Sequence, residues 1–338
     1  MTHMVLMETG KIKVQGPFEE ADRRAFPQES LRANLPELWR IKLGLEAKYP
    51  VTLQDWRSEA AACRNLRNAL KRRKTMIEAK TVTFAYRRGI PVLNDISCTI
   101  HDGEAVALLG HNGSGKTTLS RLFMALNHPR SGQVLIDGRD IVNFEPADLA
   151  DQIGYVFQNP DLQILGDTVY EEVAYGLANK KLPRSTIDRQ VRDAVEAMGL
   201  TPFLDRYPRA LSFGQKRRLG VATALALQPK TLILDEITNG QDEQEKCHMM
   251  AYLGRLQQER HMTLILITHD MDIARTYTTR ALVLSHGDLV YDGLTAELFD
   301  GKRPIEAWGL KQPILSRICA QMKVTGVTTP EELCSSLR

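Results

Sequence analysis

Residues 110–117 combine glycines, a lysine and a hydroxyl in the order G-H-N-G-S-G-K-T, which matches the pattern G-x-x-x-x-G-K-[ST] at every fixed position. The glycines lack side chains, so successive backbone N–H groups can converge on phosphate oxygens. Lys116 can reach the β and γ phosphates, and the hydroxyl of Thr117 can ligate Mg²⁺. These residue types predict a site for a nucleotide with its magnesium ion.

The elements around this loop have to hold it in place. Residues 104–109 form a short apolar run that is typical of a buried parallel strand, and residues 118–126 repeat apolar side chains at helical spacing. The N-terminus of that helix would add partial positive charge at the phosphates. The alternative is a glycine-rich turn with a chance Lys-Thr pair, but the flanking strand and helix favour a nucleotide-binding loop.

A second group of chemically useful side chains follows another apolar strand, residues 231–234. Asp235 can hold Mg²⁺ directly or through water, and Glu236 could polarise an attacking water for in-line transfer. Strand ends are often acidic for no functional reason. The pair gains weight because it follows a phosphate loop in the same chain.

Residues 211–219, L-S-F-G-Q-K-R-R-L, predict a second anion-binding device about 100 residues after the first. Ser212 is a candidate N-cap of a helix that Pro229 stops. Because one phosphate site does not need two such devices, the second is predicted to serve the nucleotide of another subunit.

At this point residues 76–300 resemble the ATP-binding cassette (ABC) ATPases, whose signature looks like Leu211–Gln215, with Phe213 in place of a glycine. The resemblance implies an α/β fold of the P-loop NTPase ABC-cassette type, a mixed sheet core with a helical subdomain. It implies ATP and Mg²⁺ as cofactors and ATP hydrolysis as the activity. It also implies a head-to-tail dimer with a second cassette, as a homodimer or a heterodimer.

Site residues carry over by position. Glu236 resembles the general base, Gln158 the Q-loop residue that senses Mg²⁺ and the attacking water, and His269 the switch histidine. Asp242 lies at the position of the D-loop aspartate. Candidate metal ligands are Thr117, Gln158 and Asp235, and the candidate nucleotide contacts are Tyr86, which resembles the aromatic residue that stacks on adenine, together with Gly110, Asn112, Gly113, Ser114, Gly115, Lys116, Thr117, Thr118, Ser212, Gly214 and Gln215.

Two positions depart from the family. Ile237 replaces the usual proline after Asp-Glu, and Gln241 replaces the usual leucine before Asp242, whereas Thr238 and Gly240 match. Because Lys116 and Glu236 are intact, catalysis is expected to survive, and altered contacts across a dimer are the expected consequence.

Residues 158–165 (Q-N-P-D-L-Q-I-L) and 168–176 (T-V-Y-E-E-V-A-Y-G) are similar to the ATPases of energy-coupling factor (ECF) transporters, which import vitamins and the transition metals cobalt and nickel. This implies an integral membrane transport subunit and a substrate-binding membrane subunit as partners. The protein would lie peripherally on the cytoplasmic face of the cell membrane. Two alternatives stay open: a soluble ABC ATPase without a transport role, and a catalytically impaired remnant of a double cassette.

A repeat sets the expected domain organisation. Residues 4–16 parallel residues 281–293 without gaps, with Gly10 and Gly16 matching Gly287 and Gly293. We therefore expect residues 1–60 to be the tail of a preceding, largely missing cassette. Residues 61–75 are expected to form a linker helix, residues 76–304 the ATPase domain, and residues 305–338 a helical C-terminal tail. The alternative for residues 1–60 is an unrelated N-terminal extension.

The composition fits this interpretation. A charged fraction of 25% and an apolar fraction of 43% are those of a folded protein, and a net charge of +3 gives no argument for nucleic acid as a partner. The five cysteines show no metal-ligand spacing and read as thiols in a reducing cytosol. Because apolar runs have only strand length and no secretory signal is visible, any membrane role is expected to come through a partner.

Overall fold

The computed structural model describes residues 3–8, 11–17, 75–87, 89–180, 182–238 and 243–322. The chain divides into two units, residues 1–74 and 75–338. The predicted linker helix over residues 61–75 lies outside the described residues except for Thr75, which begins a strand instead.

The described part of the first unit is a hairpin of β1 (His3–Glu8) and β2 (Lys11–Pro17). Its antiparallel register joins Met4 to Gly16 and Met7 to Ile12, with an irregularity between Leu6 and Met7. The hairpin of β11 (Arg280–Ser285) and β12 (Asp288–Leu294) has the corresponding register at every residue pair, and its irregularity falls at the corresponding step, between Val283 and Leu284. The two segments that repeat in sequence therefore also share their pairing and the position of the bulge.

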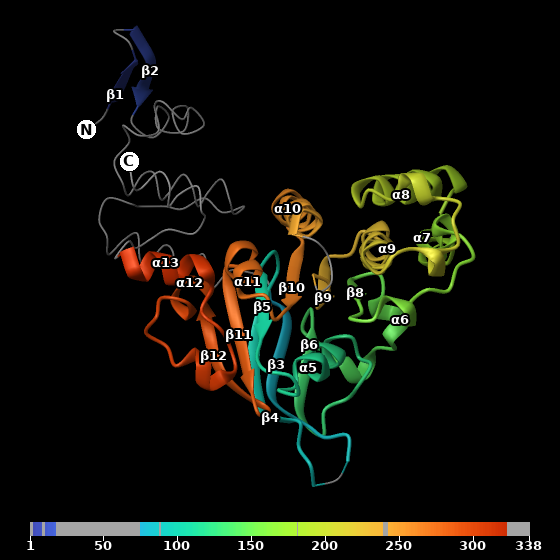
Figure 1. Ribbon diagram of the computed structural model, residues 1–338, viewed down its shortest axis with the longest axis horizontal. Helices are drawn as coiled ribbons and strands as arrows, with labels where there is room; N and C mark the ends of the chain where they lie inside the picture. Colours follow the sequence, from blue (N-terminus) through green and yellow to red (C-terminus); the bar gives the residue numbers. More distant parts are fainter. Residues whose placement is uncertain are drawn as a thin grey trace. The chain divides into compact units, whose positions relative to one another are not determined.

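The second unit is built on a six-stranded sheet in the order β12-β11-β5-β10-β9-β8 (Figure 1). Its central strands are parallel, and the edge strand β12 runs antiparallel to β11. The parallel strands besides β11 are β5 (Ala105–Leu109), β8 (Ile153–Val156), β9 (Thr231–Asp235) and β10 (Thr263–Ile267), each buried along its whole length. Their continuous apolar sequences are those of strands covered on both faces, as predicted.

A second, four-stranded antiparallel sheet has the order β4-β3-β6-β7. It consists of β3 (Thr75–Phe84), β4 (Leu93–His101), β6 (Ser131–Ile136) and β7 (Arg139–Asp140). Alternating strands and helices predicted the parallel sheet alone, because the strand pattern does not say which strands pair. One buried cluster lies between the sheets and includes Ile77, Val106 and Phe123.

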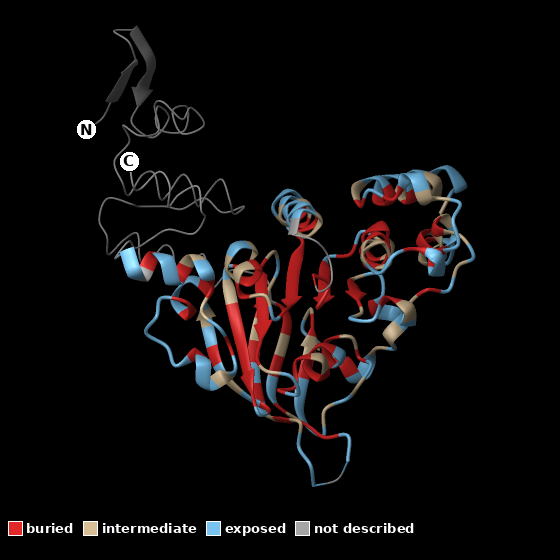
Figure 2. Cartoon of the chain, in the orientation of Figure 1, coloured by how far each residue is buried: buried red, intermediate tan, exposed pale blue. Residues whose placement is uncertain are grey.

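The helices cover the six-stranded sheet and extend beyond it. The helical subdomain contains α7 (Val169–Ala178), α8 (Arg184–Ala197) and α9 (Phe213–Ala226), which Figure 1 places beyond β8. Their apolar faces join those of β8, β9 and α10 in a second buried cluster, and Figure 2 shows the buried faces turned inward. The other α-helices within the described residues are α5 (Lys116–Phe123), α6 (Pro146–Leu149), α10 (Glu243–Arg260), α11 (Met271–Tyr277), α12 (Thr295–Leu298) and α13 (Ile314–Met322). No helix within the described ranges has the length and apolar character needed to cross a bilayer.

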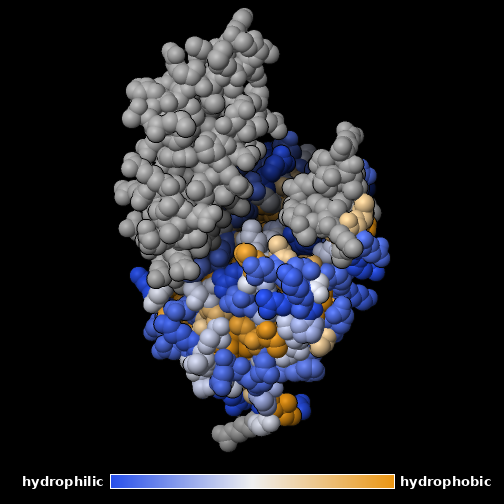
Figure 3. Space-filling view, turned by 90° about the vertical axis from the view of Figure 1, so that its left-hand side faces the viewer, coloured by the Kyte–Doolittle hydropathy of each residue, from blue (hydrophilic) through white to orange (hydrophobic). Residues whose placement is uncertain are grey.

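The edge strand β12 faces solvent with alternating side chains. Asp288 and Asp292 are exposed, as is Leu294, whereas Tyr291 is buried. Figure 3, which views this side of the molecule, shows a mostly hydrophilic face with a local apolar patch. Charged residues on an edge strand disfavour pairing with further chains.

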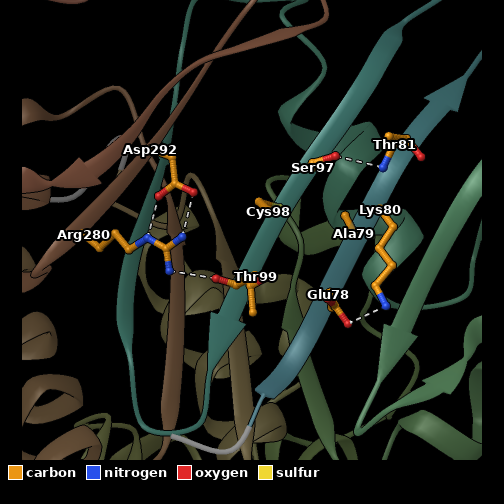
Figure 4. A pocket seen from close by; sticks show the side chains of 9 residues that line it. All are labelled: Glu78, Ala79, Lys80, Thr81, Ser97, Cys98, Thr99, Arg280 and Asp292. Atoms are coloured by element: carbon orange, nitrogen blue, oxygen red, sulfur yellow. Dashed lines mark hydrogen bonds and ion pairs between the residues drawn. The ribbon is translucent and has the colours of Figure 1, made fainter. Parts of the chain in front are cut away.

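A shallow pocket of about 350 Å³ lies where β3 and β4 meet β12 (Figure 4). Arg280 donates to both carboxylate oxygens of Asp292, at 2.6 and 2.7 Å, and to the backbone oxygen of Thr99 at 2.7 Å. Cys98 lines the same pocket, and burial, reinforced by the nearby Asp292 carboxylate, raises the pKa of its thiol to about 12.

Cys98 is therefore expected to resist alkylation at pH 8 in the native protein, whereas the exposed Cys247 reacts. Because the pKa of the thiol is higher folded than unfolded, where it is 9.0, the folded state loses stability as pH rises from about 9 to about 12. Mass spectrometry after iodoacetamide treatment of native and denatured protein checks the first statement. Cys98→Ala should remove the part of the stability loss between about pH 9 and pH 12 that comes from this thiol. An unchanged pH profile of stability in Cys98→Ala would contradict the expected pH dependence.

Candidate functional site

Four predicted site segments meet at the carboxyl edge of the six-stranded sheet. The strands β5, β10, β9 and β8 are parallel neighbours in that order. The phosphate loop follows β5, His269 follows β10, Asp235 ends β9 with Glu236 directly after it, and Gln158 follows β8. Ligands of open α/β sheets bind at this edge. The strand order thus brings together residues that lie far apart in the chain.

The phosphate loop is packed tightly against β11. Gly110 has φ 141°, and a Cβ there would lie 2.1 Å from the backbone oxygen of Leu284 and 2.7 Å from Oγ of Ser114. Only glycine fits this position. The Ser114 hydroxyl is buried and has no hydrogen-bond partner within the described part of the chain. A buried donor without a partner, inside a loop of this sequence, fits a phosphate oxygen as its acceptor.

His111 at the tip of the loop is held by two C-terminal segments. Its Nε2 accepts a hydrogen bond from the backbone N–H of His286 at 3.2 Å, and the two imidazole centroids are 4.5 Å apart. On its other side is Gly309, where an added Cβ would come within 2.8 Å of the His111 Cβ. Gly309 also has φ 74°, which disfavours a side chain.

Lys116 begins α5, and its ammonium group lies inside the loop. The Nζ donates to the backbone oxygens of Gly110 at 2.9 Å and His111 at 3.0 Å. Burial lowers the pKa of Lys116, while the carboxylates of Glu236 and Asp235 oppose that shift. Its positive charge is thus held in a poorly solvated position, where an anionic phosphate would interact strongly with it.

A pair of oxygen donors suited to Mg²⁺ lies beside the loop. Thr117 Oγ1 donates to Asp235 Oδ2 at 3.3 Å, and the Tyr155 hydroxyl donates to the same oxygen at 2.8 Å. Burial, together with the neighbouring Glu236, raises the pKa of Asp235, and the hydrogen bonds from Tyr155 and Thr117 oppose that rise. A hydroxyl and a carboxylate at this separation fit a hard cation that completes its shell with phosphate and water.

Glu236 is held from both sides. One carboxylate oxygen accepts from Gln158 Nε2 at 2.6 Å, and the other lies 2.5 Å from His269 Nε2. The backbone of Glu236 is left-handed, with φ 52°, and its N–H donates to Ile267 on β10 at 2.8 Å. Such a conformation is uncommon outside glycine and concentrates at functional sites. The three residues predicted to be catalytic, Glu236, Gln158 and His269, therefore form one contiguous group.

Tyr86, predicted to stack on adenine, is exposed beside the loop. Its ring packs edge-on against Phe84 at 4.9 Å, and its hydroxyl lies 3.3 Å from Thr118 Oγ1. Replacing Tyr86 with alanine is expected to weaken ATP binding about tenfold, because stacking on a base is worth roughly 1–3 kcal/mol. Tyr86→Phe, which keeps the ring, should bind as the parent does in a fluorescent-nucleotide titration. Equal weakening in both variants would argue for the hydroxyl instead.

The signature stretch begins α9 as predicted. Ser212 Oγ accepts from the N–H of Gln215 at 3.3 Å, and Gln215 Oε1 accepts from the N–H of Ser212 at 2.9 Å. This reciprocal capping box fixes the helix N-terminus. Phe213, in the first turn, is exposed. The role of Ser212, Gly214 and Gln215 toward a second cassette is not tested by a single chain and stays a prediction.

Of the two departures from the family pattern, Ile237 lies within the described residues and Gln241 does not. Ile237 is buried in the cluster beneath the helical subdomain, and Thr238 is also buried. The isoleucine therefore contributes to the core, a packing role that a proline could fill only in part. Gly240, Gln241 and Asp242, including the predicted D-loop aspartate, lie outside the described residues.

Two residues of the site were missed by sequence reasoning. Tyr155 supports Asp235, and its hydroxyl also lies 3.2 Å from that of Ser120. Arg217 is buried and donates to the backbone oxygen of Glu236. Tyr155 could have been noticed, because it places a hydroxyl inside the otherwise apolar strand Ile153–Val156. Arg217 could not, because an arginine directly after Lys216 is normally expected to be an exposed charge.

Comparison with known proteins agrees with this geometry. The ABC transporter family matches residues 93–239. An energy-coupling factor transporter ATP-binding protein, EcfA1, of Mycoplasma mobile is 41% identical over 73% of this chain and 90% of its own length. An ABC transporter ATP-binding protein of Methanosarcina mazei is 41% identical over 74% of this chain, but the alignment spans only 43% of that longer relative.

A solved structure shows the same architecture. CbiO1 of Clostridium perfringens, described as part of the ABC transporter complex cbiONQ, is 34% identical with a TM-score of 0.63, and the match covers 74% of this chain and all of that one. Because EcfA1 is 41% identical and the match covers 90% of its length, the chain belongs to the family of ABC transporter ATP-binding proteins.

Proposed function

We propose that the chain is the ATP-binding and ATP-hydrolysing subunit of an ECF-type importer for a vitamin or a transition metal ion of the cobalt and nickel class. The observation that carries the catalytic part is the position of the Glu236 carboxylate between Gln158 and His269 at the mouth of the phosphate loop. The likeness to EcfA1 and to a protein of a cbiONQ complex supports the transport part.

The nucleotide would be held by this chain's own groups. Lys116 and the loop N–H groups bind the phosphates, Ser114 offers its free donor, and Tyr86 offers its ring to the base. Thr117 and Asp235 would hold Mg²⁺, which when bound neutralises charge on the β and γ phosphates. Glu236 takes a proton from the attacking water. Gln158 and His269, which contact both of its oxygens, orient that carboxylate.

A second cassette would complete the site. Ser212, Gly214 and Gln215 lie at a helix N-terminus, which carries partial positive charge, and they are proposed to cap the γ phosphate bound by that other cassette. Differential affinity for ATP in the closed dimer then drives closure, and hydrolysis releases it.

Contact with a membrane subunit is proposed for the segment between Gln158 and Gly176. Leu162, Leu165 and Tyr175 are exposed there by 77%, 69% and 58%. Apolar side chains exposed near one another are typical of docking surfaces. Because the Gln158 end of the segment touches Glu236, a subunit bound there would also be connected to the catalytic carboxylate.

Two measurements test this function. The purified chain should hydrolyse ATP in the presence of Mg²⁺, and it should co-purify with a membrane subunit from cells that express both. Leu162→Ser together with Leu165→Ser should abolish co-purification and leave basal turnover within about twofold, since surface substitutions rarely disturb a fold. ATP turnover by a chain that fails to co-purify with any membrane subunit would favour a soluble ABC ATPase.

For residues 1–60 we propose a repeat of the closing part of a cassette. The shared register and bulge of the hairpins β1–β2 and β11–β12 support it. If the two are equivalent, replacing residues 281–293 by the sequence of residues 4–16 should preserve the melting transition. Residues 5–17 in the same place form the control, because a slip of one residue turns every side chain to the opposite face. Equal loss of stability in both chimeras would overturn the repeat.

A further inference from the structure

Arg217 connects the signature helix to two catalytic segments. Its guanidinium, in the second turn of α9, donates through Nη1 to the backbone oxygen of Glu236 at 2.8 Å and through Nη2 to that of Gln158 at 3.4 Å. The residue is only 4% exposed. The two acceptors follow β9 and β8, so a single side chain on the helix bridges the segments just beyond both strands.

Arg217 bonds to Glu236 at a residue whose backbone conformation is already restricted. Glu236 is left-handed, its N–H is taken by Ile267 and its carbonyl by Arg217. With both peptide groups fixed, the direction of the side chain toward Gln158 and His269 is fixed as well. Loss of the Arg217 bond would leave a buried carbonyl to be satisfied elsewhere and would allow the strained backbone to relax.

The helix also holds the segment that follows Gln158. Lys216 Nζ lies 2.8 Å from Asp161 Oδ1, and Gln163 Nε2 lies 3.5 Å from the backbone oxygen of Gly220. These bonds attach α9 to residues 159–163, whereas Arg217 reaches further, to the catalytic strand itself. An arginine suits this position because its planar fork can serve two carbonyls at once, which an ammonium group does less well.

Phe213 covers the guanidinium from outside. The carbon Cζ of Arg217 lies 4.6 Å from the centre of the ring of Phe213, one helical turn earlier, and Phe213 is 47% exposed. A cation over an aromatic face is attracted by the ring quadrupole, and the attraction is stronger when the pair is desolvated. Phe213 occupies a position that is glycine in the family pattern. It connects the exposed surface of the signature stretch to the buried Arg217.

We propose that Arg217 is a positioning residue that sets the carboxylate of Glu236 and the segment of Gln158 relative to the signature helix, with Phe213 holding its guanidinium in place. The assignment rests on the proposed ATPase function. Movement of α9 against a second cassette is thereby transmitted to the catalytic carboxylate of the same chain. Arg217 itself contacts backbone oxygens of the site and takes no part in proton transfer.

The matched control is the next residue. Arg218 lies on the same helix but bonds to the backbone oxygen of Met198 and to Glu245, away from the catalytic strands. Arg217→Gln is expected to lower kcat by about tenfold to a hundredfold, because small misplacements of catalytic groups have effects of that size. The Kd for ATP should stay within about threefold, since no phosphate contact is removed. Arg218→Gln should change kcat by about twofold at most, as expected for a residue outside the site.

Two further variants keep the test decisive if Arg217→Gln does not fold. Arg217→Lys keeps the charge but loses the fork, and it should recover only part of kcat. Phe213→Leu is at the surface and removes the aromatic ring; it should lower kcat severalfold with an unchanged melting temperature, while Phe213→Tyr retains parental turnover. Equal kcat values for the glutamine variants at 217 and 218, or for Phe213→Leu and the parent, would overturn the assignment.

Hydrogen exchange separates this assignment from the proposed function. Peptides that cover residues 153–163 and 231–238 should exchange faster in Arg217→Gln than in Arg218→Gln, whether or not ATP is hydrolysed. A parent chain without ATP turnover would refute the ATPase proposal alone. Exchange that is the same in both variants would refute the role of Arg217, even in an active enzyme.

Discussion

Glu236→Gln is expected to lower ATP turnover by about a thousandfold while ATP still binds, because a positioned general base contributes roughly 10²- to 10⁴-fold. Glutamine has the same shape and can keep a contact to Gln158 or His269, but it cannot take a proton from water. Since the proposed dimer opens only after hydrolysis, the variant should also accumulate an ATP-bound dimer. Steady-state turnover, nucleotide titration and gel filtration with ATP measure the three effects.

The matched control for this substitution is Glu245→Gln, which alters a carboxylate that pairs with Arg218 on the helical side. It should leave turnover near that of the parent. Parental turnover in Glu236→Gln would show that another group is the base. A monomeric ATP complex with no turnover would keep Glu236 as the base and remove the argument for the closed dimer.

Lys116→Met is expected to weaken ATP binding by at least about a hundredfold, since a phosphate placed in the loop would lose its charged donor at a poorly solvated position. The methionine keeps most of the volume of the side chain. It also removes the cost of burying an ammonium group whose pKa burial already lowers. The melting temperature of the free protein should therefore stay the same or rise, so lost binding cannot be ascribed to unfolding.

Lys302→Met is the control, because Lys302 is an exposed lysine paired with Asp300. A titration with a fluorescent ATP analogue and a thermal melt of each variant give the comparison. If Lys116→Met bound ATP as well as the control, the loop would not be the phosphate site. A lower melting temperature together with lost binding would require Lys116→Arg as a third variant, which restores the charge.

The strands and the loop could be predicted from sequence because their signals are local. A continuous apolar run such as residues 105–109 defines a buried strand by itself, and the loop sequence carries its own conformational requirement in Gly110. The antiparallel sheet could not be predicted in the same way. Its strands β3 and β6 pair across a long stretch of chain, and no periodicity within either strand records that partner.

The same distinction holds within the site. Glu236, Gln158 and His269 could be named from their order along the chain, but their mutual distances depend on β10 lying between β5 and β9. The role of Arg217 could not be predicted from the sequence, because its acceptors are backbone oxygens, and a carbonyl has the same chemistry in every residue. Its partners therefore leave no mark in the sequence, and neither does the left-handed backbone of Glu236.

The fit between His111 and Gly309 has a consequence for how this protein can change over evolutionary time. The Cβ of His111 occupies the space that any side chain at 309 would need, and the backbone at 309 already disfavours one. Among relatives, the two positions should therefore vary as a pair, with a larger residue at 309 accompanied by glycine at 111, because every other residue has a Cβ there. A substitution near the end of the cassette would then be tolerated only in a lineage whose phosphate loop had changed first.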